Sequence, residues 1–447
     1  MRRGSMMLAL LIGGVASALA APPAVQITTL DNGLRAVLAP DPEARAVDVA
    51  VWYPTGPAVE KPGQSGITHV FERLMFRGTE SRGAGEYRRL LEAEGAGVNT
   101  LTTPDFTSYF ATVPEGAVDL ALQLESERMT KLRFTAADLE ADRGLALSER
   151  RSLLEANPVG LGVEKLYATA FPGHGYGRPV LGLENDLRRI SFDDAQEYYR
   201  DRYGPNHAVL TVVGRFDPQA TLAAIRRDFG SLPRRGAAVE PAPLPPPAAR
   251  GSAATPGRVP VVLVGWRAPG SADAATASLE ILARVLGSGS QGRLSGGTSN
   301  PLVMQARAGF DPARAGSFLY AFASLRSGAD SSAVERFLIG AVEGLADEAV
   351  AAEELDRAKR DWELDWLAAQ QTVRGRARAI GTALLVDGDV AAPAKRLEAI
   401  RNLTPADLQD TARKLLRPEA RSVVWLTPAA GATVPDAAGK NARGSRR

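Results

Sequence analysis

The stretch 66–79, GITHVFERLMFRGT, holds the side chains whose types and spacing best suit chemistry. His69, Glu72 and Arg73 stand at i, i+3 and i+4, so they share one side of a helix. A His-x-x-Glu-His helix places two imidazoles that hold zinc beside a carboxylate that activates the water on the metal. Here Arg73 takes the place of the second imidazole, and a guanidinium stays protonated and has no lone pair for a metal. The stretch has the frame of a zinc peptidase site with one ligand replaced.

The same stretch has an apolar side that a helix would bury. Its apolar residues recur at helical spacing: Ile67, Val70, Phe71, Leu74 and Met75. This periodicity predicts an amphipathic helix that packs on a core and presents His69, Glu72 and Arg73 on its other side.

A second helix is expected to supply further carboxylates. The stretch 135–156 begins with a capping-box pattern, Thr-Ala-Ala-Asp, and Asn157-Pro158 stops it. Asp142 and Glu149 lie seven residues apart, about two turns along one face. Zinc needs a third protein ligand, and a carboxylate from such a helix is the available source.

A cleft that holds these carboxylates needs a positive charge. Glu72, Asp142 and Glu149 would repel one another in a closed cleft without a metal. Arg73 can pair bidentately with a carboxylate there and supply part of the missing charge. It would then preserve the fold while abolishing hydrolysis.

The length and composition of the chain limit how it can be divided into domains. A chain of 447 residues is too long for one ordinary core and favours two domains. The stretch 233–258, rich in Pro and Ala, predicts a stiff linker between domains at 25–232 and 259–428. Residues 429–447 read as a disordered tail. The formal charge of 53 − 51 = +2 is scattered, which argues against nucleic acid as a partner.

The two halves resemble each other. The stretches 191–214 and 404–427 align without a gap at an offset of 213, and each reads as a cap, a helix, a proline and an apolar strand. We expect an α+β fold in which each half is a mostly antiparallel sheet with helices on one face. Expected strands are 33–39, 46–53, 109–113, 259–266 and 317–323, and expected helices are 84–94, 118–132, 135–156, 273–286, 331–348 and 353–367. No glycine-rich phosphate loop opens these helices, which argues against a nucleotide fold.

The N-terminus reads as a signal peptide over 1–20. Arg2 and Arg3 precede an apolar run at 6–15, and Ala18-Leu19-Ala20 offers a cleavage site. The run is too short to span a bilayer, so we expect no membrane span in the mature chain. The chain has no cysteine, which excludes disulfides and thiolate metal sites. A periplasmic or secreted protein is expected.

These motifs together resemble the pitrilysin/insulinase-type inverted-zincin peptidases, in particular their processing-peptidase branch. In that family the ligating glutamate follows the last motif residue by about 76 positions, and 149 − 73 = 76. The resemblance covers about 27–428 and includes four further segments: 99–107, 171–177, 203–217 and 354–359.

The resemblance implies a fold and a set of roles. The two homologous domains would face each other as a clamshell. Zinc, the cofactor of the family, would be held by His69 and Glu149, with Glu72 and Asp142 as the catalytic carboxylates. The segment with Asn99 and Thr100 resembles the edge strand that faces the substrate. Such a strand can bind an extended peptide by strand addition without any catalysis.

Two departures point to lost activity, namely Arg73 and the absence of an Arg–Tyr pair that active relatives carry after a Ser-Arg-Leu-like segment, here Gly292-Arg293-Leu294. We therefore expect zinc binding to be weak or absent.

The favoured hypothesis is an impaired subunit that binds peptides or unfolded proteins, or pairs with a family member whose motif is intact. One alternative is an active zinc endopeptidase with a modified ligand set. The resemblance places the loop with His174 near the cleft, which makes His174 one candidate for the lost ligand. Another alternative is a structural assembly subunit.

Overall fold

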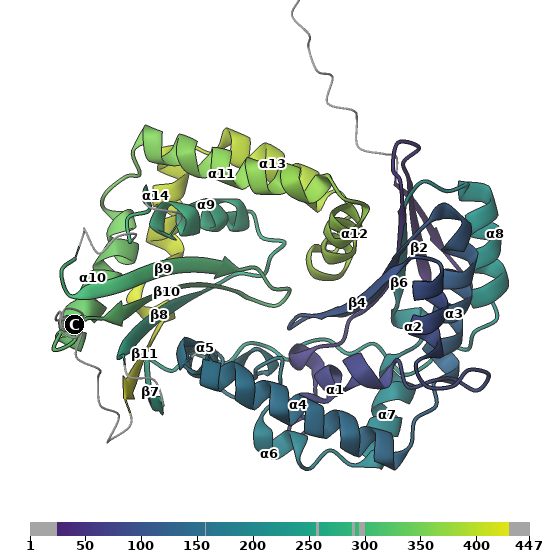
Figure 1. Cartoon of the computed structure of the whole chain (residues 1–447). Helices are drawn as coiled ribbons and strands as arrows, with labels where there is room; N and C mark the ends of the chain where they lie inside the picture. The colour runs from purple at the N-terminus through teal and green to yellow at the C-terminus, as the bar shows by residue number, and fades with distance from the viewer. Residues whose placement is uncertain (1–24, 157, 256–258, 288–290, 295–299, 429–447) are drawn as a thin grey trace, which may run out of the picture.

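The computed structural model describes residues 25–156, 158–255, 259–287, 291–294 and 300–428. The predicted signal peptide at 1–20 and the predicted tail at 429–447 lie outside these ranges. Two sheets, one from each half of the chain, face each other across the molecule (Figure 1). The expected α+β clamshell is confirmed.

The N-terminal sheet has six strands in the order β1-β2-β6-β3-β5-β4. The pair β2/β6 is parallel, and the other neighbours are antiparallel. The strands are β1 (Gln26–Thr29), β2 (Arg35–Pro40), β3 (Val47–Tyr53), β4 (Gly97–Thr102), β5 (Thr107–Val113) and β6 (Val209–Gly214). The strand with Asn99 and Thr100, β4, lies at the edge of the sheet, as the resemblance implies.

The C-terminal sheet repeats this plan with five strands in the order β7-β11-β8-β10-β9. It too has one parallel pair, β7/β11, in the place of β2/β6. The strands are β7 (Arg250–Thr255), β8 (Val261–Ala268), β9 (Val303–Asp311), β10 (Ser317–Leu325) and β11 (Arg421–Pro428). Since β7 lies inside the range 233–258, the segment predicted as a linker contains a strand that pairs with the sheet. Its alternation of small and polar residues (RGSAAT) gave no strand signal.

Each sheet packs one face against helices of its own half. In the N-terminal half these are α1 (Ile67–Leu74), α2 (Glu86–Ala93), α3 (Val118–Lys131), α4 (Ala136–Ala156), α7 (Phe192–Arg202) and α8 (Pro218–Phe229), with a short α6 (Glu184–Leu187) nearby. In the C-terminal half they are α9 (Ala275–Gly287), α10 (Ser331–Glu343), α11 (Ala352–Gln370), α13 (Ala392–Asn402) and α14 (Pro405–Leu415).

The predicted internal repeat is confirmed in detail. Helices α7 and α14 both begin with a capping box, Ser191 with Asp194 and Thr404 with Asp407. Each helix is followed by a short 3-10 turn and then by an inner strand, β6 or β11. The two strands occupy equivalent places in their sheets.

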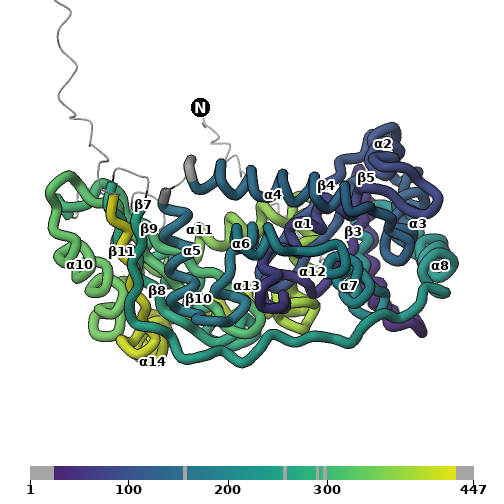
Figure 2. Tube along the Cα trace, turned by 90° about the horizontal axis from the view of Figure 1, so that it is seen from below, coloured from purple at the N-terminus to yellow at the C-terminus, as the bar shows by residue number. Residues whose placement is uncertain are grey.

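The second face of each sheet is also covered, which the expectation of helices on one face did not include. Helix α5 (Pro158–Ala170) belongs to the N-terminal half but buries Leu166 against Leu263 and Val424 of the C-terminal sheet. In return, α12 (Val373–Thr382) and the π-helical turn Ala383–Asp387 cover the N-terminal sheet, where Leu385 meets Trp52. Figure 2 shows α5 lying along the strands of the C-terminal sheet. The two halves therefore exchange helices.

No helix in the part of the chain that the structure describes is both long enough and apolar enough to cross a bilayer.

Candidate functional site

The site is built on α1, whose first turn is held in place by a buried glutamate. Gly66 begins the helix with φ 93°, and a Cβ there would lie 2.7 Å from Cα of Gly182. Glu60 accepts hydrogen bonds from the backbone N–H groups of Gly66 (3.0 Å) and Thr68 (3.1 Å). It thereby pairs N–H groups that the first helical turn leaves without a partner. Sequence reasoning missed Glu60, because it lies six residues before the N-cap residue Gly66 and outside any capping pattern.

The apolar side of α1 is buried as predicted. Ile67, Val70, Phe71, Leu74 and Met75 all lie in the core of the N-terminal half. This packing turns the opposite side of the helix toward α4 and the edge strand β4.

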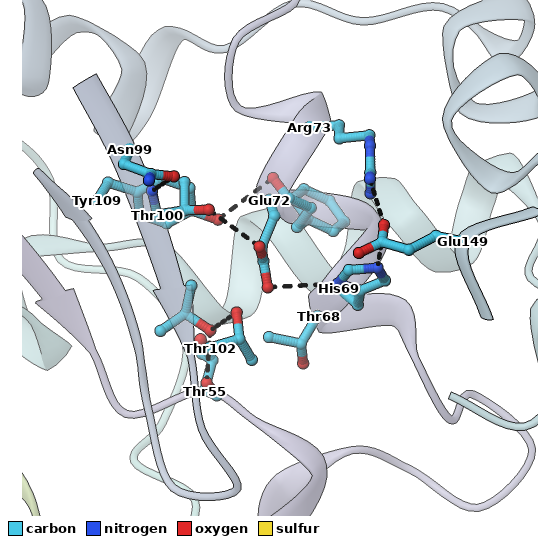
Figure 3. A network of polar contacts seen from close by, with 12 residues as sticks. Thr55, Thr68, His69, Glu72, Arg73, Asn99, Thr100, Thr102, Tyr109 and Glu149 are labelled. Carbon is cyan, nitrogen blue, oxygen red and sulfur yellow. Dashed lines mark hydrogen bonds and ion pairs between the residues drawn. The ribbon is translucent and has the colours of Figure 1, made fainter. Parts of the chain in front are cut away.

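His69 is almost fully buried between two carboxylates. Its Nδ1 atom lies 3.3 Å from Oε1 of Glu72 in a hydrogen bond. Its Nε2 atom lies 3.3 Å from Oε2 of Glu149 without the geometry of a hydrogen bond, so it is a buried nitrogen with no hydrogen-bond partner. Figure 3 shows the imidazole between these two side chains. The predicted pair of ligands thus comes together from α1 and α4.

Arg73 reaches the same carboxylate. Its Nη2 atom donates to Oε2 of Glu149 at 2.5 Å, the atom that also faces His69 (Figure 3). The contact uses a single guanidinium nitrogen, whereas a bidentate pair was expected. Both side chains are partly exposed, at 32% for Arg73 and 44% for Glu149.

Asp142 is paired with Arg77, a residue that sequence reasoning did not single out. Nε of Arg77 donates to Oδ2 at 3.0 Å and Nη2 to Oδ1 at 2.5 Å, which is a bidentate pair. The Asp142 side chain is only 2% exposed. The spacing along the sequence could have revealed this pair. Arg77 follows Arg73 by four residues, and Asp142 precedes Glu149 by seven, so a second arginine and a second carboxylate stand next to the first pair.

Glu72 lies between His69 and β4. It accepts a hydrogen bond from Oγ1 of Thr100 at 2.9 Å. Burial raises the pKa of Glu72, but hydrogen bonds from His69, Thr102 and Thr100 outweigh burial and leave this pKa below its usual value. Glu72 is therefore a carboxylate at neutral pH, the form that a general base requires.

A cleft of about 540 Å³ opens between α1, α4, the start of α2 and the edge strand. Its lining carries both charges and includes both predicted edge-strand residues: Glu72, Arg73, Phe76, Arg77, Ala84, Gly85, Arg88, Asn99, Thr100 and Asp142. Asn99 turns its Oδ1 back to the N–H of Thr100 at 2.8 Å.

These residues do not fit the three-ligand zinc site of a His-x-x-Glu-His helix. His69 and Glu149 are two donors, and the third position holds a guanidinium that already bonds Glu149. Within the described ranges, no group of three or more His, Asp or Glu side chains is arranged to hold a metal ion.

His174 does not supply the lost ligand. Its Nδ1 accepts a hydrogen bond from the N–H of Tyr176 at 3.0 Å, and its Nε2 lies 2.9 Å from the carbonyl of Ala242. Both ring nitrogens are thus engaged away from His69, and burial lowers the pKa of this imidazole. The alternative in which His174 completes the ligand set is wrong.

The Gly-Arg-Leu segment of the second half has a structural contact. Arg293 donates to both carboxylate oxygens of Glu354 at 2.9 and 2.8 Å, which ties the segment to the start of α11. The segment 292–294, where the chain departs from the family, thus contacts the family-like segment 354–359.

Comparison with known proteins identifies one peptidase family. The family model described as insulinase, peptidase family M16, matches residues 35–184, and the model of the M16 inactive domain matches residues 189–361. An uncharacterized zinc protease of Streptomyces coelicolor is 30% identical over 282 residues, 60% of each chain. The zinc protease PqqE of Helicobacter pylori is 29% identical over 211 residues, 47% of this chain and 48% of that protein. The matches thus span about half to three fifths of these relatives.

Solved structures share the fold over nearly the whole chain. A protease from Helicobacter pylori superposes with a TM-score of 0.85 at 24% identity, covering 91% of this chain and all (100%) of that one. An M16 inactive-domain protein from Pseudomonas fluorescens gives a TM-score of 0.81 at 17% identity, covering 91% and 98%. With both family models matched in order and the fold shared along the chain, this protein belongs to the insulinase (M16) peptidase family.

Proposed function

We propose that this protein is an exported peptide-binding member of the insulinase family whose own hydrolysis is impaired, and that it pairs with a family member carrying an intact zinc motif. One observation carries the proposal. The guanidinium of Arg73 takes the place of the second imidazole and bonds Glu149, the residue that would otherwise face a metal beside His69.

Peptide binding needs no metal in this arrangement. Strand β4 forms the edge of the N-terminal sheet, and its Thr100 lies next to Glu72 in the cleft. Backbone groups of an edge strand bind an extended peptide through main-chain hydrogen bonds, and side-chain pockets add selectivity. The cleft of about 540 Å³ beside β4 has room for side chains of such a peptide.

Export and pairing rest on different supports. The arginine pair and apolar run of residues 1–20 favour a signal peptide. Pairing is supported by the incomplete ligand set, because a subunit that binds peptides but lacks a full metal site contributes to cleavage only beside an active one.

The test is the zinc content of the wild-type protein beside that of Arg73→His. After dialysis against a chelator and return to buffer with zinc, wild type should hold well under one zinc per chain. Arg73→His should approach one, because the new imidazole joins His69 and Glu149 and releases Glu149 from its ion pair. Atomic emission gives the ratio of zinc to protein.

Two controls separate the loss of a charge from the gain of a ligand. Arg73→Gln removes the charge without adding an imidazole and should remain low in zinc. Arg73→His combined with His69→Ala should lose the metal again. Tight 1:1 zinc in wild type that disappears on His69→Ala would contradict the proposal and favour an active zinc endopeptidase.

A further inference from the structure

We infer that the cleft beside β4 selects extended peptides that carry a carboxylate group, and that Arg88 is the residue that recognises it. This inference rests on the proposed peptide-binding function and adds the chemistry of the peptide. It follows from which hydrogen-bonding groups of the cleft are already paired and which remain open.

The pattern of strand pairing shows which backbone groups of β4 face outward. The N–H of Thr103 donates to the carbonyl of Phe106 at the turn between β4 and β5. Bonded and non-bonded pairs alternate along an antiparallel ladder. Leu101 and Asn99 therefore bond to β5, while the backbone groups of Val98, Thr100 and Thr102 face away from it. An added strand would pair with these residues and would take the N–H of Thr100 from Oδ1 of Asn99, which accepts it at 2.8 Å in the absence of a peptide.

The carboxylates of the cleft already have partners. Asp142 is held by both nitrogens of the Arg77 fork at 3.0 and 2.5 Å. Glu72 accepts from Thr100 at 2.9 Å and from His69 at 3.3 Å. Each oxygen of these two carboxylates thus already accepts a hydrogen bond, and the charge of Asp142 is matched by Arg77, which weakens the attraction of the cleft for a Lys or Arg of a peptide.

Open donors remain on the opposite wall. Arg88 of α2 lies with its guanidinium 5.3 Å from the ring centre of Phe76, and its Nη1 donates to the outward carbonyl of Val98 at 3.3 Å. Glu92 is 3.5 Å away in an exposed pair. Within the described ranges, Nε and Nη2 of Arg88 have no hydrogen-bond partner, and the side chain is 46% exposed.

This arrangement presents a cation next to the positions of an added strand. The contact with Phe76 limits the freedom of the guanidinium, whose planar fork matches a carboxylate. Arg73 donates a hydrogen bond to Glu149 from one nitrogen and adds a second positive charge to the same cleft. The matching ligand is a carboxylate, either an Asp or Glu side chain or the C-terminus of the peptide.

The test measures binding of fluorescent peptides by anisotropy. A strand-forming peptide with a central Glu is compared with the same peptide carrying Gln, each with a free and with an amidated C-terminus. At low ionic strength wild type should bind a carboxylate form about five- to tenfold more tightly than its neutral counterpart, and added salt should reduce the difference. Dependence on Glu identifies a side chain, and dependence on the free end identifies the C-terminus.

Two variants of Arg88 and one matched control assign the preference. Arg88→Gln should remove it, and Arg88→Glu should reverse it in favour of a peptide with a central Lys. Arg89→Gln is the control, because Arg89 is the next residue of α2, pairs with Glu86 at 3.2 Å and does not line the cleft. It should leave the preference unchanged.

Equal affinity of wild type for all four peptides would overturn this inference and leave the proposed peptide binding intact. A preference that survives both Arg88 variants, with melting temperatures near that of wild type, would overturn the assignment to Arg88. Absence of binding by every peptide, the Lys form included, would overturn the proposed function together with this inference.

Discussion

Arg73 lies in the last turn of α1 and Arg77 three residues beyond the end of this helix, and each pairs with a carboxylate of α4. The two pairs differ in burial. Glu149 is 44% exposed beside Arg73, whereas Asp142 is 2% exposed beside Arg77. An exposed ion pair contributes roughly 0–1 kcal/mol, but a buried carboxylate that loses its partner costs about 3–5 kcal/mol. Arg73 thus supplies part of the charge of the cleft through Glu149, as expected, whereas the buried carboxylate of Asp142 is neutralised by Arg77, which was not expected.

Arg77→Ala should lower the free energy of unfolding by about 3 kcal/mol, and Arg73→Ala by less than about 1 kcal/mol. Urea denaturation of both variants checks this order. Adding Asp142→Asn to Arg77→Ala should recover part of the loss, because the unpaired buried charge is then gone. Equal losses for the two single variants would mean that burial does not separate the two pairs.

At the scale of elements, the two helices that the halves exchange are packed by different means. Helix α5 is packed mainly by apolar side chains, with Leu166 fully buried on the C-terminal sheet. Helix α12 adds charges to its apolar contacts, since Arg374 pairs with buried Asp48 at 3.4 Å and Arg376 with Asp41 at 2.7 Å. Burial raises the pKa of Asp48 to about 6 although Arg374 opposes that shift.

Close packing of α12 depends on a glycine. A Cβ at Gly381 would lie 2.3 Å from the indole of Trp52, which is fully buried and donates to Thr211 at 2.9 Å. Gly381→Ala should therefore destabilise the protein by about 1–3 kcal/mol through overpacking. Thermal unfolding followed by circular dichroism measures the change.

Gly340→Ala is the matched control for this prediction. Gly340 is also helical, lies exposed on α10, and has no atom within 4 Å of an added Cβ. The change there should stabilise the protein by up to about 1 kcal/mol, because alanine loses less backbone entropy on folding than glycine. If both variants shift the melting temperature in the same direction, α12 does not pack as described.

At the scale of the molecule, the halves share apolar cores as well as facing each other. One shared core joins α5 to strands β8, β10 and β11, and the other joins the turn after α12 to β2, β3 and β6. Separating the halves would expose both cores. The clamshell is thus closed at both exchanged helices, where each half covers a sheet of the other.

The full chain should unfold in one calorimetric transition, with a van't Hoff enthalpy close to the calorimetric enthalpy. The separately produced halves 25–232 and 233–428 should each bind a hydrophobic dye, because an exchanged face lies open, and mixing them should reduce that binding. Two well-resolved transitions in the full chain would show that the halves fold independently.

The chemistry and the repeat were determined by the sequence itself, because they depend on spacing along the chain. His69, Glu72 and Arg73 share a helix side by periodicity alone, and the resemblance to the family, with its interval of about 76 residues, pointed to Glu149 as the partner from a second helix. The aligned stretches at 191 and 404 predicted equivalent helix–strand units, which the structure confirms. That Arg73 follows His69 by four residues can be read directly from the sequence.

Only the tertiary structure decided which side chains meet across long intervals. The pairing of Arg77 with Asp142 and the capping of α1 by Glu60 depend on how helices and loops dock. The exchange of α5 and α12 was not predicted either, although the residues of β3 indicated that both faces of the sheet are covered. Its run Val47–Tyr53 is apolar except for Asp48 and is buried at every position, and a strand with apolar side chains on both faces must be covered on both. Periodicity reports that a face is buried, whereas only packing reveals which segment of the chain covers it.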